Sequence, residues 1–84
     1  MNKIYLLRLL GGKTRLAIIT VLTSGPKIVT EIADKVNQTH SATSHQLGLL
    51  KMAGIVTTKR EGREVRYSLS NTRAGKLAAK IVSL

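Results

Sequence analysis

The hydroxyl, histidine and lysine side chains between Thr39 and Gly54 are the part of this sequence best suited to recognising a ligand. At a helical spacing of about 100° per residue they gather on one side of the segment, and leucines and alanines gather on the other. The polar side consists of His40, Ser41, Ser44, His45, Gly48 and Lys51, and the apolar side of Ala42, Leu47, Leu49, Leu50 and Ala53. The apolar side is expected to pack, and the polar side offers small hydrogen-bonding groups that suit the major groove of DNA.

The charge of the chain favours an anionic partner. Lys and Arg number 14 against 4 Asp and Glu, a net charge of +10. Such an excess attracts polyanions, with nucleic acid first and an anionic membrane surface second. No apolar run approaches the roughly 20 residues of a membrane-spanning helix. We therefore expect a soluble protein whose partner is double-stranded DNA, with no membrane.

Size and cysteine content set further limits. The 84 residues suit a single domain, 1–84, small enough to profit from burial against a partner copy. The absence of cysteine excludes disulfides and thiolate metal sites and suits a reducing, cytoplasmic location. Arg8 interrupts the apolar stretch at the start, and no cleavage motif follows, so this stretch is expected to belong to the mature protein.

Helical and extended patterns follow one another in a definite order. Helices are expected over 2–10 and 13–23, then over 31–36 with Thr30 as N-cap, and over 40–52 with Thr39 as N-cap. Residues 27–29 form a short extended piece, and strands 55–59 and 64–69 flank a glycine-containing loop at 60–63. The last helix, 71–84, has an apolar face that needs a neighbour, formed by Ala74, Leu77, Ala78, Ile81 and Leu84.

This order predicts a mainly α (α+β) fold, a winged helix-turn-helix with a two-stranded β wing at 59–66. Several short motifs then resemble the ArsR-type family of repressors over nearly the whole chain. They are Gly12-Lys13-Thr14-Arg15-Leu16, Thr30-Glu31-Ile32-Ala33, Thr39 to Leu47, Ala53-Gly54-Ile55-Val56, and Arg60-Glu61-Gly62-Arg63 with Tyr67-Ser68-Leu69.

The resemblance implies a homodimer, joined through N- and C-terminal dimerisation helices at 2–10 and 72–84, that binds a palindromic operator and represses transcription. The recognition positions that it implies are Thr39, His40, Ser41, Thr43, Ser44 and His45. Helical phasing moves Thr43 toward Leu50, so it is expected to pack or to reach a phosphate. Gly48 stands in the middle of the groove-facing arc, where it either allows close approach of a backbone or has no role.

Phosphate contacts supply most of the affinity of such a protein, and contacts at base edges supply sequence preference. The base-contacting candidates are His40, Ser41, Ser44 and His45. The phosphate candidates are Thr39, Lys51, Lys59, Arg60, Arg63 and Arg66, with Lys13 and Arg15. Arg63 could also enter a narrow minor groove. The plainer interpretation is that the basic hairpin is a solvated edge protected from aggregation by its charge.

The ligands through which many members of that family sense metals have no counterpart here. Segment 31–36 contains no cysteine, and segment 72–84 contains neither acid nor histidine. His40 and His45 are separated by about 140° around a helix and cannot clamp one ion together. We therefore expect no metal and no cofactor. Constitutive or concentration-controlled repression ranks above induction by an organic ligand, a protein, or pH acting through the histidines.

Other function classes stay open. A non-specific architectural DNA-coating protein would suit the high charge and the lack of long base-contacting side chains. Winged helices also serve as protein docking modules. An enzyme is disfavoured, because the chain has 4 carboxylates, no cysteine and no plausible triad.

Overall fold

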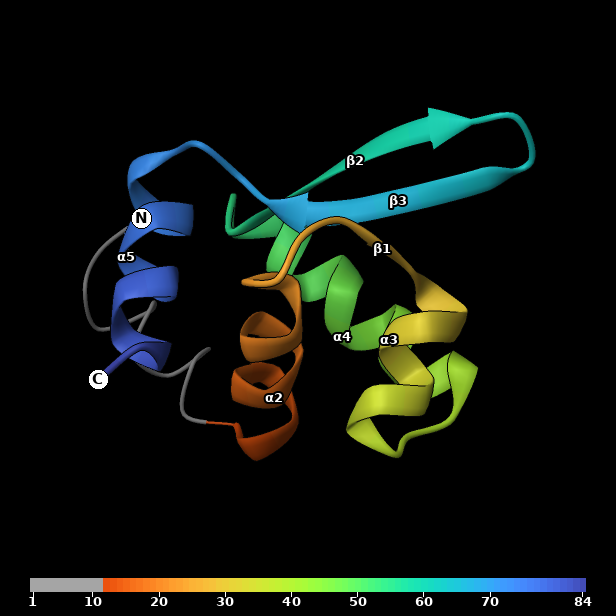
Figure 1. The fold of residues 1–84 in the computed structure, drawn as a ribbon, viewed down its shortest axis with the longest axis horizontal. Helices are drawn as coiled ribbons and strands as arrows, with labels where there is room; N and C mark the ends of the chain where they lie inside the picture. The colour runs from red at the N-terminus through yellow and green to blue at the C-terminus, as the bar shows by residue number, and fades with distance from the viewer. Residues whose placement is uncertain (1–11) are drawn as a thin grey trace.

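The computed structural model describes residues 12–84, so the predicted helix at 2–10 lies outside the described part. The elements follow in the order α2 (Lys13–Leu22), β1 (Lys27–Ile28), α3 (Val29–Val36), α4 (His40–Met52), β2 (Val56–Glu61), β3 (Glu64–Leu69) and α5 (Arg73–Val82). The helices pack together along one side of the sheet, and the β2–β3 hairpin extends beyond them at the end opposite to α5 (Figure 1). The predicted winged helix-turn-helix is confirmed. No helix among residues 12–84 is both long and apolar enough to cross a bilayer.

The sheet has one strand more than the two-stranded wing that was predicted. Its order is β1-β3-β2, with both pairs antiparallel, and Ile28 lies opposite Arg66. Residues 27–29 were expected to be extended, but nothing in so short a segment indicates a pairing partner. The contact forms because the hairpin returns past the start of α3.

The hairpin turn is tighter than predicted. Glu61 pairs with Glu64, so only Gly62 and Arg63 form the turn, where a loop over 60–63 had been expected. Gly62 has a φ of 63°, which matches the glycine-favouring first position of a two-residue hairpin turn. Arg63 therefore stands at the very tip of the wing.

Helix caps explain where α3 and α4 begin. The Oγ1 of Thr39 accepts a hydrogen bond of 3.0 Å from the Ala42 N–H, which confirms Thr39 as the N-cap of α4. The prediction of Thr30 as the cap of α3 is wrong, because the helix already begins at Val29 after Ile28. The carboxylate of Glu31 accepts the Ile28 N–H at 3.0 Å instead, and so supplies the cap from inside the helix.

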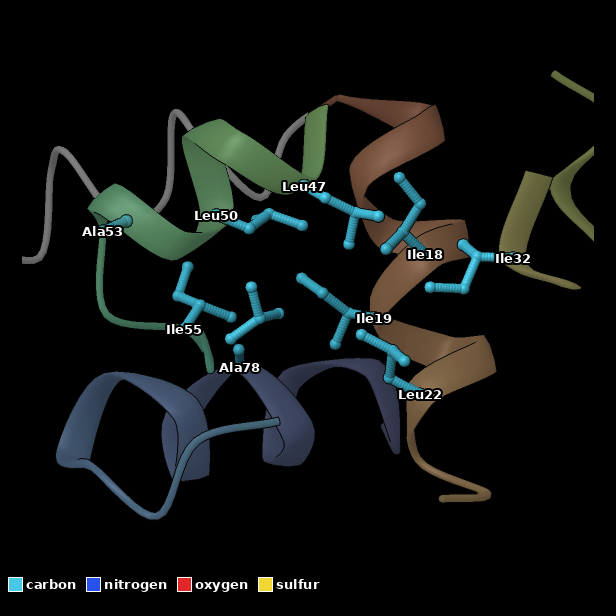
Figure 2. Packing of buried hydrophobic residues seen from close by; sticks show 10 residues of the cluster. Ile18, Ile19, Leu22, Ile32, Leu47, Leu50, Ala53, Ile55 and Ala78 are labelled. Atoms are coloured by element: carbon cyan, nitrogen blue, oxygen red, sulfur yellow. The ribbon is translucent and has the colours of Figure 1, made fainter. Parts of the chain in front are cut away.

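Aliphatic side chains from each helix within residues 12–84 meet around α2 (Figure 2). Ile18 and Ile19 of α2 are completely buried, and so are Ile32, Leu47 and Ile55. The close packing of these groups gives α4 a fixed support on one side. The core members are Ile18, Ile19, Leu22, Ile32, Leu47, Leu50, Ala53, Ile55, Val56 and Ala78.

A hydrogen-bonded clasp, formed by Gly54, Ser70, Thr72 and Gly75, joins the end of α4 to the start of α5. The hydroxyls of Ser70 and Thr72 both donate to the carbonyl oxygen of Gly54, Thr72 at 2.7 Å. Thr72 also caps α5 by accepting the Gly75 N–H at 3.1 Å. The last helix therefore begins at Arg73, after the capping residue, and not at Asn71 as predicted.

Candidate nucleic-acid interface

The predicted division of α4 into two faces is present in the structure. His40, Ser41, His45, Gly48 and Lys51 are exposed, as is the capping residue Thr39. Ser44 is half-buried at the margin of this face. On the opposite side Leu47 and Leu50 are completely buried. The helix thus presents small polar groups from a rigid support, which is the arrangement that contact with base edges in a groove requires.

Thr43 does not belong to the exposed face. Its side chain is 0% exposed, and its Oγ1 donates to the carbonyl oxygen of Thr39 at 2.8 Å. Of the two roles expected from helical phasing, packing is therefore the one found, and a phosphate contact is not available. Because this hydroxyl is buried within the first turn of α4, Thr43 is removed from the recognition positions that the resemblance implied.

The basic side chains of the hairpin do not share one surface. Lys59, Arg60 and Arg63 are exposed. In the β2–β3 register Lys59 lies opposite Arg66, whereas Arg60 lies opposite Val65. Because successive strand residues point to opposite faces, Lys59 and Arg60 point away from each other. A ligand that lies against one face of the wing therefore contacts Lys59 or Arg60 but not both. Arg63 is exposed in the turn at the tip, where the two faces meet.

Arg66 is held by two of the chain's own carboxylates. Its Nε lies 3.0 Å from Glu61 Oε1, and its Nη1 lies 3.8 Å from Glu31 Oε1. Half-exposed pairs of this kind each contribute about 0–1 kcal/mol to stability. Their main effect is geometric, because the pair with Glu31 ties the wing to the first turn of α3, and the pair with Glu61 links β2 to β3. Arg66 is therefore better placed to position the wing than to meet a phosphate.

Arg15 also contacts the protein itself. Its Nε donates to Gln46 Oε1 at 2.7 Å, which links α2 to the middle of α4. Lys13, the other candidate at the start of α2, is exposed. The sequence offered no signal for the Arg15–Gln46 contact, because it depends on how α2 crosses α4.

An open hollow of about 360 Å³ lies where the first residues of α3 and α4 approach the wing. It brings together His40 and Arg63, two candidate residues that are far apart in sequence. Sequence reasoning did not find Thr30 or Tyr67 at this place, since three separate elements must meet to form it. The hollow is lined by Ile28, Val29, Thr30, His40, Arg63, Glu64, Val65 and Tyr67.

Within residues 12–84, no three His, Cys, Asp or Glu side chains come together where they could hold a metal ion.

Two solved structures with a similar arrangement of elements are described as a transcriptional repressor and a possible transcriptional regulator. The transcriptional repressor BigR of Xylella fastidiosa matches with a TM-score of 0.86 at 29% identity, over 94% of this chain and 78% of that one. A homodimeric winged helix-turn-helix DNA-binding domain from Mycobacterium bovis, described as a possible ArsR-family regulator, matches with a TM-score of 0.80 at 28% identity, over 90% and 70%.

Sequence comparison leads to the same group. The HTH-type transcriptional regulator NmtR of Mycobacterium tuberculosis is 41% identical over 71 residues, which are 84% of this chain and 59% of that protein. The chain thus spans little more than half of this relative's length. The model of the bacterial regulatory protein arsR family matches residues 12–58, from α2 to β2, which is more than half of the chain. With the resemblance seen in the motifs thus confirmed, the chain belongs to the arsR family of bacterial regulatory proteins.

Proposed function

We propose that this chain is a homodimeric, sequence-specific DNA-binding transcriptional regulator that acts as a repressor. The observation that carries the proposal is the exposed polar face of α4 beside a basic wing, on a chain with a net charge of +10. A helix of this kind fits the major groove, and a basic hairpin next to it can follow the phosphate backbone. The homodimeric DNA-binding neighbour and the repressor BigR support the same function.

In this proposal the base contacts come from His40, Ser41, Ser44 and His45. These side chains are short, and none is the bidentate Arg or Asn that discriminates best between bases. Each contact is expected near the lower end of about 1–3 kcal/mol. Operator preference should therefore come from several weak contacts added over two half-sites.

The phosphate contacts are assigned to exposed groups that are free to turn outward. Thr39 uses its oxygen as an acceptor within the cap, and a hydroxyl keeps one proton to donate. Arg66 is assigned a positioning role because of its two carboxylate partners. The remaining phosphate candidates are Lys13, Lys51, Lys59, Arg60 and Arg63.

Selection of bound fragments from a random duplex library tests the proposal directly. A dimer with two-fold symmetry should enrich paired, inverted half-sites whose centres are about 10 base pairs or a multiple of that apart. Enrichment of unpaired sites would contradict the dimer, and the absence of any salt-dependent binding would contradict DNA recognition and favour a protein docking role.

One observation favours a second candidate, a non-specific DNA-coating protein. The exposed face of α4 carries no long hydrogen-bonding side chain except Lys51, and the exposed Met52 is apolar, so backbone contacts could supply nearly all the affinity. The ratio of affinity for selected and unselected duplexes at one salt concentration separates the two functions. A regulator should show a ratio of roughly 10³ or more, and a coating protein a ratio near one.

A further inference from the structure

The hollow between α3, α4 and the wing has the composition of an anion site. His40 reaches it from the first position of α4, and Arg63 reaches it from the tip of the wing. Both residues are exposed, so their polar groups are free to meet a ligand. Thr30 and Tyr67, whose side chains carry hydroxyl groups, line the same hollow. The remaining lining consists of the aliphatic residues Ile28, Val29 and Val65 and the carboxylate of Glu64, which is the one group that opposes an anion.

The position of the hollow indicates which anion it would receive. It lies between the helix proposed to enter the major groove and the hairpin proposed to lie beside the backbone. A strand of duplex DNA passing from one to the other crosses this point, and its regularly spaced phosphates are the charges available there. An open hollow of about 360 Å³ has ample room for one phosphate group with its water.

We propose that this hollow seats one backbone phosphate of bound DNA between Arg63 and the protonated imidazole of His40, so that DNA affinity falls as pH rises. The inference rests on the proposed DNA-binding function, and it moves His40 from a base contact to a pH-dependent phosphate contact, which leaves the base contacts to Ser41, Ser44 and His45. Arg63 keeps its charge at every physiological pH, whereas a histidine gains or loses charge between pH 5 and 8. The site therefore binds phosphate with two cations at the acidic end of this range and with one at the alkaline end.

The direction of the effect follows from the charges around His40. The wing contributes Arg63, Glu64 and Tyr67 to the lining, while β1 and α3 contribute only uncharged residues. The phosphate interacts more favourably with imidazolium than with neutral imidazole, so binding is linked to proton uptake. Affinity is then highest below neutral pH and decreases toward pH 8.

His45 provides the matched control. It is also exposed on α4, but it is not among the residues that line the hollow. His40→Gln and His45→Gln remove the same titratable group from the same helix. Both substitutions are at exposed positions, so the fold should be retained, and circular dichroism of each variant verifies this.

The experiment measures binding of the full chain to a labelled mixed-sequence duplex, as a function of salt, at several values between pH 5 and 8. For the parent protein, log K against log salt should be steeper by about 1 at the acidic end, because one more phosphate charge is neutralised. His40→Gln should lose this difference and bind at all pH values like the parent at pH 8. His45→Gln should keep it.

Three results would overturn the proposal: a parent salt slope that does not change with pH, a His40→Gln variant that keeps the parent's pH dependence, or a His45→Gln variant that loses it. Failure of the parent to bind DNA at any pH is a different result. It would refute the proposed function itself, and the pH-dependent contact along with it.

Removal of acidic groups tests the location independently of pH. Glu64→Gln removes the carboxylate from the hollow, and Asp34→Asn removes one from an exposed position of α3 outside it. The first variant should bind DNA more tightly than the second, although the net charge changes equally. Equal affinities would place the phosphate elsewhere.

Discussion

At the scale of single residues, burial separates groups that the helical pattern had placed side by side. Thr43 and Ser44 are adjacent in α4, yet Thr43 is completely buried and Ser44 lies at the margin of the exposed face. The helical period alone predicted most of this face correctly. It could not decide the role of Thr43, because the decisive interaction is a hydrogen bond to the helix's own Thr39 carbonyl.

Replacement of Thr43 by valine should leave DNA binding intact. Valine keeps the shape, and the Thr39 carbonyl retains its bond from the Thr43 N–H at 3.0 Å. We expect a change of less than about 1.5 kcal/mol in the free energy of unfolding, measured by urea denaturation. DNA affinity should stay within a factor of about two, well below the tenfold that 1.4 kcal/mol represents. A marked loss of affinity in a stable variant would mean that the hydroxyl contacts DNA.

Arg63→Ala should weaken binding to every sequence. The residue stands at the wing tip, and the loss of one phosphate contact should reduce the salt slope by about 1. Lys80→Ala is the matched control, because Lys80 is exposed on α5, at the end of the molecule opposite to the wing tip (Figure 1). If both variants show the parent's slope, the wing does not contact the backbone.

At the scale of elements, the clasp between α4 and α5 depends on a close approach at Gly75. A Cβ at this position would overlap the backbone oxygen of Ser70. No rotation of a side chain can relieve that contact, since the neighbouring atom belongs to the backbone. The start of α5 would have to move, and the hydroxyl bonds to Gly54 would be disturbed with it.

Gly75→Ala should therefore destabilise the protein by about 1–3 kcal/mol, despite the better helix propensity of alanine. Gly48→Ala is the control with the opposite expected sign. A Cβ at Gly48 would meet no neighbouring atom within 4 Å, and the position is an exposed helix interior, so alanine should stabilise by about 1 kcal/mol. Thermal unfolding of both variants measures the difference, and equal effects would contradict the close approach at Gly75.

Elements with local causes were predictable, and elements with distant causes were not. The cap at Thr39, the glycine at the hairpin turn and the two faces of α4 arise from neighbours in the chain. The pairing of β1 with β3 and the hollow beside His40 arise from contacts between segments far apart in sequence. Local sequence patterns do not indicate which distant segments come together. The polar face of α4 could therefore be predicted from the sequence, but the hollow beside it could not.

At the scale of the whole molecule, α5 is the described helix proposed to join two copies. Ala78 is buried in the core, whereas Leu77 and Ile81 are half-buried and expose part of their surface. The exposed parts of these two side chains form an apolar stripe one turn long. Burial of such a stripe against a second copy would add to the limited core of a small protein.

Leu77→Asp should weaken the dimer by more than about tenfold, because a carboxylate would be buried in an apolar interface. Analytical ultracentrifugation measures the dissociation, and circular dichroism checks that the monomer stays folded, since part of Leu77 also packs on the core. Lys76→Asp, at the adjacent exposed position, should remain dimeric. A folded Leu77→Asp variant that sediments like the parent would exclude this stripe as the interface.

Glu31 connects the wing to the backbone amide of Ile28, far from the wing tip. One carboxylate oxygen both receives the Ile28 amide and faces the Arg66 guanidinium. If the hairpin bends so that Arg66 moves away, the Glu31 carboxylate loses one of its two partners. If Glu31 moves with Arg66, the Ile28 N–H loses its hydrogen-bond acceptor. A displacement of Arg66 with the hairpin would therefore act on the first turn of α3 through the single carboxylate of Glu31.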